Sequence, residues 1–367
     1  MSYFSEELLK WYRVNRRILP WREDPTPYHV WLSEIMLQQT RVEAVKGYYS
    51  RFLETLPDVA SLASASEDTC LKLWEGLGYY SRVRNLRKAA CEVMERCGGE
   101  IPDTAAELIK LPGIGKYTAA AIASIAFGER IPAIDGNLLR IYARLAMYED
   151  NIRTPAAQKR ASEYFENLMP ESAAVKGREN PCGDFNQALM DLGSTVCLPG
   201  SAACCGKCPA ADFCRTHKER PGREAELPFI PAAAEKKTEL LTVFIIRNGE
   251  KTAVRKRSSK GLLAGLYEFP NAAGALDDKE AAAWLRKNHV EPLRIRRICD
   301  ADHIFTHKKW IMRGYEVLTD SLAESPIPFI MADREEITGK YCIPSAFSGY
   351  LEWLIAAESG KSSYKAE

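Results

Sequence analysis

The 367-residue chain is long enough for two or three ordinary domains, and its 46% apolar residues can supply a sizeable core. With 50 basic and 49 acidic side chains its net charge is +1, so any surface for a polyanion must be local. Ordinary glycine and proline usage excludes collagen-like and mostly disordered chains, and no apolar run approaches the ~20 residues of a membrane span. The amino-terminal stretch lacks a signal-peptide core, which predicts a cytoplasmic protein.

The amino-terminal two thirds of the chain has the periodicity of helices. Phe4, Leu8 and Tyr12 recur at helical spacing, and glycine and proline separate one such segment from the next. We therefore predict an all-α region over 1–225. Residues 226–237 are rich in proline, alanine and glutamate, which is the composition of a linker.

Beyond the linker the pattern changes to that of strands. The stretch LLTVFIIRNGEKTAVRKR has two β-rich runs around an Asn-Gly pair, which predicts a hairpin. We predict further strands at 266–270 and within 293–318, and helices over 277–289 and 346–358. The expected fold class is multi-domain, with the all-α region followed by an α+β domain over 238–367.

Cysteines crowd into the short stretch 197–214, where the chain has Cys197, Cys204, Cys205, Cys208 and Cys214. A disulfide knot is not expected in an unsecreted chain of this size. Thiolates with gaps of two and five residues can surround one tetrahedral centre, either zinc or an iron–sulfur cluster. The spacing alone leaves open whether Cys204 or Cys205 is a ligand.

A glycine hairpin and two carboxyl residues are candidates for phosphate binding and for catalysis. Gly113 and Gly115 permit a tight turn before a helix whose first amide groups can bind a phosphate. Asp135 opens the next helix, where its ordinary role would be that of a cap. Glu34 lies among apolar residues at helical spacing, so burial should raise its pKa. One neutral and one ionised carboxyl is the arrangement that cleaves a glycosidic bond.

Around these residues the sequence closely resembles the MutY-type adenine DNA glycosylases of the helix-hairpin-helix superfamily, which includes endonuclease III. The matching stretches follow one order along almost the whole chain, namely LPWRE, TPYHVWLSEIMLQQTRV, WEGLGYYSRVRNL, LPGIGKYTAAAI, IDGNLLRIYAR, DFNQALMDLG, the cysteine cluster, GLLAGLYEFP and HIFTH. The resemblance implies an enzyme that removes adenine mispaired with 8-oxoguanine or guanine from double-stranded DNA, after flipping the base out of the duplex.

The resemblance implies catalytic roles for four residues. Glu34 matches the general acid that protonates N7 of adenine, and Asp135 matches the carboxylate that stabilises the oxocarbenium-like sugar. Tyr117 and Asn137 match residues that hydrogen-bond around these carboxyls. Because bifunctional relatives carry a Schiff-base lysine where Tyr117 stands, the resemblance implies a monofunctional enzyme.

Other residues match the family's contacts to DNA. The implied adenine pocket consists of Arg17, Leu19, Trp21, Arg22, Val42 and Gln187. Residues implied to contact the DNA backbone, the opposite strand or 8-oxoguanine are Gln39, Thr40, Leu77, Tyr79, Gly113, Gly115, Phe305, Thr306 and His307. Tyr79 matches an aromatic wedge whose stacking is worth ~1–3 kcal/mol. Thr306 stands where the family has serine, which keeps the hydroxyl but stiffens the rotamer.

The carboxy-terminal domain resembles the family's Nudix-like domain. Its helix KEAAAWLRKNH lacks the paired glutamates that hold Mg²⁺ in a working Nudix hydrolase, which implies a recognition module without hydrolase activity. The family's cysteine spacing implies one [4Fe–4S] cluster on Cys197, Cys205, Cys208 and Cys214, with a first gap of seven residues where six is usual.

Other functions remain as alternatives. One is an endonuclease III-like glycosylase and lyase, and another is a thymine or uracil mismatch glycosylase. A third, from a different class, is a non-catalytic iron–sulfur DNA-binding protein. Tyr117 disfavours the lyase, and the retention of Glu34 and Asp135 disfavours the non-catalytic protein. We expect a monomer at the nucleoid in a bacterial cytoplasm, without a membrane partner.

Overall fold

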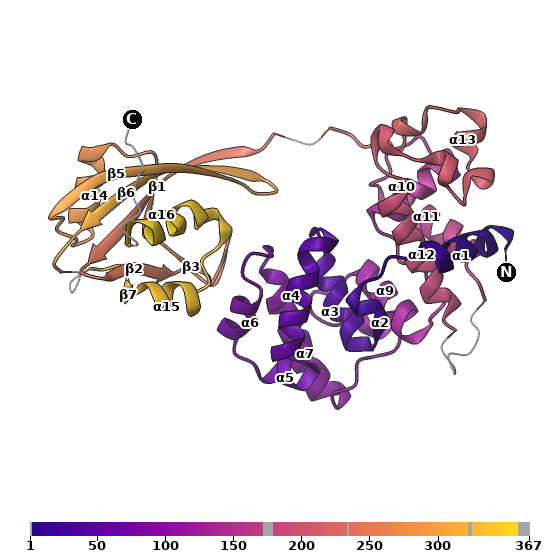
Figure 1. The fold of residues 1–367 in the computed structure, drawn as a ribbon, viewed down its shortest axis with the longest axis horizontal. Coiled ribbons are helices and arrows are strands. Elements are labelled where there is room, and N and C mark those ends of the chain that lie inside the picture. The colour runs from indigo at the N-terminus through magenta and orange to yellow at the C-terminus, as the bar shows by residue number, and fades with distance from the viewer. Residues whose placement is uncertain (1, 172–178, 233–234, 322–324, 359–367) are drawn as a thin grey trace. The chain divides into compact units, whose positions relative to one another are not determined.

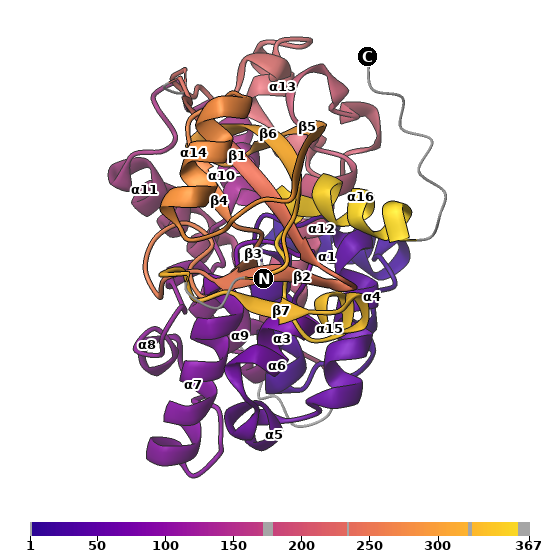
Figure 2. The ribbon, with the colours of Figure 1, turned by 90° about the vertical axis from the view of Figure 1, so that its left-hand side faces the viewer.

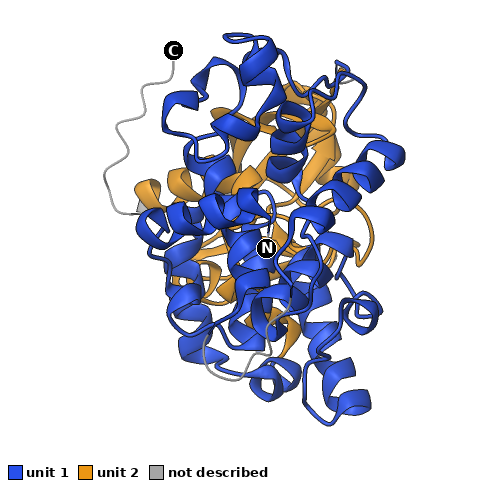
Figure 3. Ribbon diagram, turned by 90° about the vertical axis from the view of Figure 1, so that its right-hand side faces the viewer, with its two compact units in different colours: residues 1–65, 81–232 blue, residues 66–80, 233–367 orange. Residues whose placement is uncertain are grey.

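The computed structural model describes residues 2–171, 179–232, 235–321 and 325–358. The chain forms two compact units (Figure 3): unit 1 comprises 1–65 and 81–232, and unit 2 comprises 66–80 and 233–367. The boundary at 232–233 lies inside the stretch expected to be a linker. Segment 66–80, which was expected within the all-α region, is part of unit 2 instead.

Unit 1 is helical in its described residues, as the sequence predicts (Figure 1). Its helices are α1 (Tyr3–Asn15), α2 (Pro20–Glu23), α3 (Pro27–Leu37), α4 (Val42–Thr55), α5 (Val59–Ser64), α7 (Ser81–Cys97), α8 (Ala105–Leu108), α9 (Lys116–Phe127), α10 (Gly136–Leu145), α11 (Pro155–Leu168), α12 (Pro181–Thr195) and α13 (Arg215–Glu219). Short 3₁₀ turns follow α12 and α13, namely η1 (Gly200–Ala202), η2 (Cys205–Lys207), η3 (Ala211–Phe213) and η4 (Glu224–Glu226).

The helices that carry the candidate site begin at residues suited to helix starts. The hydroxyl of Thr26 caps α3 by accepting the amide of His29, and Pro27 supplies the first helical position. Helices α1, α10, α11 and α12 pack around buried residues such as Phe165 and Phe185. Among the described residues no single helix has the length and apolar character of a membrane span, although the bent pair Pro181–Thr195 and Gly200–Lys207 passes that test jointly.

Unit 2 is built on one mixed sheet. Its strands are β1 (Lys237–Asn248), β2 (Lys251–Lys256), β3 (Tyr267–Glu268), β4 (Asn271–Ala273), β5 (Arg294–Ile304), β6 (Lys308–Leu318) and β7 (Ile330–Ala332). Its helical elements are α6 (Glu67–Leu73), α14 (Asp278–Lys287), α15 (Arg334–Gly339), η5 (Ser345–Phe347) and α16 (Ser348–Glu358). The strand order is β3-β2-β1-β6-β5, with β4 beside β1 and β7 beside β2. The sequence therefore predicts α14, α16 and the strands β1, β2, β3, β5 and β6, and it misses β4, β7 and α15.

The two faces of the sheet follow from the alternation of side chains along β1. Phe244 and Ile246 face α14, where Phe244 stacks on Trp284 with a centroid distance of 4.6 Å. Val243 and Ile245 belong to the opposite core, which α16 covers. Figure 2 shows α14 and α16 on opposite sides of the strands. Burying each such side chain is worth about 1.5–3 kcal/mol, so both faces contribute to stability.

Candidate active site

One pocket in unit 1 gathers all the predicted catalytic residues and all the predicted adenine contacts. It is enclosed by α2, α3, α4, α9, α10 and α12 and by the loops next to them. The predicted residues that line it are Arg17, Leu19, Trp21, Arg22, Glu34, Thr40, Val42, Tyr117, Asp135, Asn137 and Gln187. Residues that the sequence did not single out as contacts also line it, namely Val30, Ser33, Leu37, Ile125, Met190 and Ser194.

Glu34 is a buried carboxyl with one hydrogen-bond donor. It projects from α3, is 5% exposed, and its Oε2 accepts the hydroxyl of Tyr117 at 2.7 Å. Burial, together with the nearby charge of Asp135, raises the pKa of Glu34 to about 7, although the hydrogen bond from Tyr117 and the charge of Arg22 oppose the rise. Near neutral pH a large fraction of the molecules therefore carries a protonated Glu34, as a general acid requires.

Asp135 is a helix cap, as its position predicts, and it also lines the pocket. It is the N-cap of α10, and its Oδ1 accepts the amide of Leu138 at 2.8 Å. Its Oδ2 accepts the side-chain amide of Asn137 at 2.8 Å. Burial raises the pKa of Asp135 above its ordinary value, and these donors and the charge of Arg140 offset only part of the rise. The cap thus holds the carboxylate in the pocket with both oxygens hydrogen-bonded.

Asn137 is held from behind by residues that sequence reasoning missed. Arg140 donates to Asn137 Oδ1 at 2.9 Å, and also to the carbonyl oxygens of Cys197 and Gly193 at 2.8 and 2.6 Å. A methyl group at Gly193 would lie 2.6 Å from Asn137 Cβ, so only glycine permits this approach. The sequence could have indicated Arg140, because it lies three residues after Asn137 and therefore on the same helix face.

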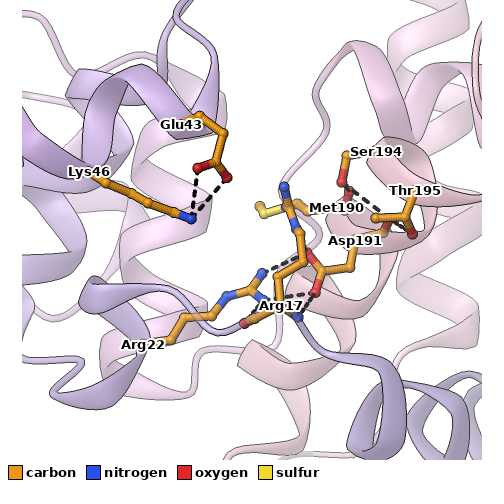
Figure 4. Close-up of polar contacts among 8 residues, drawn as sticks. All are labelled: Arg17, Arg22, Glu43, Lys46, Met190, Asp191, Ser194 and Thr195. Atoms are coloured by element: carbon orange, nitrogen blue, oxygen red, sulfur yellow. Dashed lines mark hydrogen bonds and ion pairs between the residues drawn. The ribbon is translucent and has the colours of Figure 1, made fainter.

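Two arginines of the pocket wall share one buried carboxylate (Figure 4). Asp191 is fully buried, and Arg22 donates to both of its oxygens at 2.8 and 3.0 Å. Arg17 donates to it through Nε at 2.6 Å and through its backbone amide at 3.1 Å. Asp191 follows the predicted Gln187 by one turn of α12, so helical spacing could also have indicated Asp191 from the sequence.

Two adjacent residues of α9 differ in whether they reach the pocket. Tyr117 lines the pocket beside Glu34 and also a neighbouring groove with α8 and α11, whereas Lys116 lines that groove, with Lys159, and does not line the pocket. Among the described residues that line the pocket, none is a lysine. A Schiff base of the kind that bifunctional relatives form therefore lacks an amine there.

The glycine hairpin has one constrained glycine rather than two. Gly113 has a φ of +77°, and a methyl group there would lie 2.6 Å from Asn85 Cβ. Gly115 is the N-cap of α9 with a φ of −91°, and nothing lies within 4 Å of where its Cβ would be. The turn thus requires glycine only at Gly113, while Gly115 leaves open space before the amides of α9.

The loop after α3 places Thr40 in the pocket wall and Gln39 outside it. Gln39 is exposed and left-handed, with a φ of +58°. Buried Arg82 holds this loop by donating to the carbonyl oxygens of Ile35 and Gln38 at 2.8 and 2.6 Å and to the Thr40 hydroxyl at 3.3 Å. Such strain at an exposed residue is typical of a functional loop.

Four of the clustered cysteines line a second cavity of unit 1, namely Cys197, Cys205, Cys208 and Cys214. Cys204 is exposed, does not line it, and points its thiol to the carbonyl oxygen of Ala202. Burial raises the pKa of the Cys208 thiol to about 12 and that of Cys205 to about 11. His217 and Glu224, which hydrogen-bond each other at 2.7 Å, lie close to Cys205.

The remaining predicted residues belong to unit 2. Phe305, Thr306 and His307 form the turn of the β5–β6 hairpin, where Thr306 and His307 are exposed and Phe305 packs on Trp310. Tyr79 is 47% exposed, and its hydroxyl shares a 3.0 Å hydrogen bond with that of Thr306. Leu77 is buried, so it is not available as a surface contact as the structure stands.

Comparisons with known proteins match a different family to each part of the chain. The model of the HhH-GPD superfamily base excision DNA repair protein matches residues 32–167, and that of the NUDIX domain matches 242–353. Human adenine DNA glycosylase is 42% identical, over 98% of this chain and 75% of its own. The mouse enzyme is 32% identical over 89% and 73%. The chain belongs to the adenine DNA glycosylase family.

A bacterial relative and a solved structure also resemble this chain. The adenine DNA glycosylase of Buchnera aphidicola is 32% identical over 83% of each chain. A solved structure of a thermostable thymine-DNA glycosylase superposes with a TM-score of 0.51 and 28% identity, over 59% of this chain and 95% of its own. The protein is therefore a DNA glycosylase with a helix-hairpin-helix region and a Nudix-like domain.

Proposed function

We propose that this glycosylase hydrolyses the N-glycosidic bond of adenine opposite 8-oxoguanine or guanine in duplex DNA, without cutting the strand. The observation that carries the proposal is the pair of carboxyls in one pocket. Glu34 has a pKa of about 7, and Asp135 is held by two N–H donors. A flipped adenine between them would meet a proton donor and a negative charge.

The chemistry divides between the two carboxyls. Glu34 gives its proton to N7 of adenine, so that the bond from the base to the sugar breaks and the base leaves neutral. Tyr117 occupies Oε2, which leaves Oε1 to carry that proton. Asp135 stabilises the positive charge that develops on the sugar. Water then adds its hydroxyl to the anomeric carbon, and its remaining proton restores Glu34.

We propose that one [4Fe–4S] cluster is held by Cys197, Cys205, Cys208 and Cys214. Support comes from the cavity these four share and from the exposure of Cys204. Because burial disfavours a bare thiolate at Cys208, bound iron is what would keep the sulfur ionised. Arg144 donates to Cys197 Sγ at 3.3 Å, as expected of a group facing a thiolate. When bound, a cluster supplies a cross-link that fixes the loop.

We propose that unit 2 reads the base opposite adenine. Support comes from the exposed Thr306 and His307 at the tip of the β5–β6 hairpin and from the hydrogen bond between Tyr79 and Thr306. The hydroxyl of Thr306 can donate to or accept from a purine edge. The aromatic ring of Tyr79 can stack on a neighbouring base.

A single-turnover assay tests the proposal directly. Duplexes would contain adenine opposite 8-oxoguanine, adenine opposite guanine, thymine opposite guanine, or thymine glycol, and each would be analysed with and without alkali. We expect strand breaks only after alkali, in the adenine strand, and fastest opposite 8-oxoguanine. Breaks without alkali at thymine glycol would favour the lyase, release of thymine would favour a mismatch glycosylase, and tight binding without cleavage would favour a non-catalytic protein.

A further inference from the structure

Segment 66–80 lies between two helices of unit 1 in the sequence, yet it folds with unit 2. Polar contacts fix it there along its length. Asp68 meets Lys256 at 3.0 Å, and the carbonyl oxygen of Leu71 accepts the thiol of Cys342 at 3.4 Å. The segment is therefore tied to residues nearly two hundred or more positions further along the chain.

Glu75 attaches the segment to the rest of unit 2 through both oxygens of its carboxylate, one directly and the other by way of Lys72. Its Oε1 accepts the backbone amide of Ile343 at 2.8 Å, and its Oε2 pairs with Lys72 at 2.6 Å. Lys72 in turn donates to the carbonyl oxygen of Thr338 at 2.5 Å. Both carboxylate oxygens are used, and the side chains of Glu75 and Lys72 are only 28% and 25% exposed. Glu75 and Lys72 therefore form a clamp on residues 338–343.

The same segment ends at Tyr79, which is held in an unusual backbone conformation. Tyr79 has a φ of +48°, a region that costs a bulky residue roughly 1–2 kcal/mol. The loop before it closes on itself, since Trp74 donates to the carbonyl oxygen of Gly78 at 3.1 Å. Only three residues lie between Glu75 and Tyr79, whose hydroxyl shares a 3.0 Å hydrogen bond with Thr306. Fixing Glu75 thus fixes where that ring projects.

We propose that Glu75 is a positioning and specificity-determining residue, which clamps segment 66–80 to unit 2 so that Tyr79 and Thr306 read the base opposite adenine as one rigid element. This inference rests on the proposed reading of 8-oxoguanine by unit 2. In this proposal Glu75 contacts neither the adenine nor the base opposite it. It holds the ring of Tyr79 and the hydroxyl of Thr306 at a fixed separation. That fixed pair fits 8-oxoguanine, which has an extra oxygen and an extra proton, better than it fits guanine.

The test compares Glu75→Ala with Glu75→Gln in the full chain. The amide of glutamine still offers an oxygen to the Ile343 amide, whereas alanine offers none. We expect the ratio of single-turnover rates, adenine opposite 8-oxoguanine over adenine opposite guanine, to fall about fivefold in Glu75→Ala. This is the change expected for loss of the Ile343 hydrogen bond, since the charge pair with Lys72 is lost in both variants. Glu75→Gln should stay within twofold of wild type. Glu92→Ala, at a glutamate of α7 in unit 1, is the matched control.

A second readout is independent of activity. Hydrogen exchange at the Ile343 amide should accelerate in Glu75→Ala and remain slow in Glu75→Gln, because the amide loses its acceptor only in the first variant. An unchanged Ile343 exchange rate or an unchanged rate ratio in Glu75→Ala would overturn the proposal. So would a glutamine variant as impaired as the alanine variant, because position would then not be what Glu75 supplies.

Rates of the wild-type protein and of Glu75→Ala distinguish the role of unit 2 from the role of Glu75. If wild type shows no preference for 8-oxoguanine over guanine, the proposed function of unit 2 is wrong. If wild type shows the preference and Glu75→Ala retains it, only the positioning role of Glu75 is wrong. Should Glu75→Ala fail to fold, Lys72→Met removes the other half of the clamp, and it should lower the same ratio by at least twofold.

Discussion

Glu34 and Asp135 lie in one pocket and differ in how their carboxyl groups are compensated. Glu34 accepts one hydrogen bond, from Tyr117, and is almost completely buried. Asp135 accepts one from a backbone amide and one from Asn137. Burial raises the pKa of both carboxyls, but hydrogen bonds to a carboxylate favour its ionised form, so the two donors to Asp135 oppose the rise there more than the single donor does at Glu34. This difference supports the proposal that Glu34 is the acid and Asp135 the anion.

Replacing Glu34 by glutamine should affect activity and stability in opposite directions. The pKa of Glu34 rises from 4.5 to about 7 on folding, so the folded state binds an extra proton and stability falls as pH increases through that window. Glu34→Gln should therefore be more stable than wild type by about 3 kcal/mol at pH 8 and by about 1 kcal/mol at pH 5. Base release should slow ~10²-fold or more.

Urea unfolding at the two pH values and single-turnover assays measure both effects. Glu43→Gln is the control, since the Glu43 side chain is 82% exposed and should change neither quantity. Equal stability gains at pH 5 and pH 8 would contradict the raised pKa, and a wild-type rate of base release would contradict the role as acid.

Asp191 should contribute strongly to stability through its ion pairs with Arg17 and Arg22. Burial alone would raise its pKa, but the hydrogen bond and charge of Arg22 and the charge of Arg17 lower it below the ordinary value. Asp191→Asn leaves two arginines beside a neutral amide, which should cost about 3 kcal/mol of unfolding free energy. Urea unfolding at pH 7 measures this, with the exposed Asp150→Asn as control; a loss below about 0.5 kcal/mol would show that the arginines find other partners.

Elements differ in how far the local sequence determines them. The β1–β2 hairpin was predictable because Asn248 and Gly249 sit at its turn and Asn248 pairs with Lys251. The parallel pairing of β1 with β6 was not, because Leu241 meets Met312 only through tertiary folding. The same reason hid segment 66–80, whose helical pattern says nothing of which unit it joins.

The glycine hairpin offers a matched pair of substitutions. Gly113→Ala introduces a methyl group against Asn85 at a left-handed φ, which should cost about 1–3 kcal/mol. Gly115→Ala puts its methyl group into open space at an ordinary φ, so stability should change by less than about 0.5 kcal/mol. Thermal or urea unfolding distinguishes them. Equal losses would show that the turn does not rest on Gly113.

The cysteine loop offers a second matched pair, Cys204→Ser and Cys205→Ser. Cys205 shares a cavity with the other three cysteines, and Cys204 is exposed outside it. Iron and acid-labile sulfide per chain should fall sharply in Cys205→Ser and stay at the wild-type level in Cys204→Ser. The reverse result would make Cys204 the ligand and restore the family's gap of six residues.

At the scale of the whole molecule, the motifs contain residues that the fold brings to one pocket, but not the residues that hold that pocket in place. Glu34, Asp135 and Gln187 lie in recognisable stretches, and all three line one pocket. Arg140 and Asp191 hold that pocket through contacts that are separated by more than fifty residues in the sequence. Such contacts exist only in the folded chain, so composition, periodicity and spacing could not predict them.

Deleting the chain from Thr238 onward should separate excision from recognition. All the pocket residues belong to unit 1, whereas the deletion removes Thr306 and the Ile343 partner of Glu75. We expect the truncated protein to retain alkali-revealed cleavage opposite guanine and to lose about tenfold of its preference for 8-oxoguanine. Hydrogen exchange within 66–80 should accelerate while α10 and α12 remain protected. Thr306→Ala in the full chain is the control for the hydroxyl alone. An equal preference before and after truncation would remove unit 2 from recognition, because unit 1 would then read the opposite base unaided.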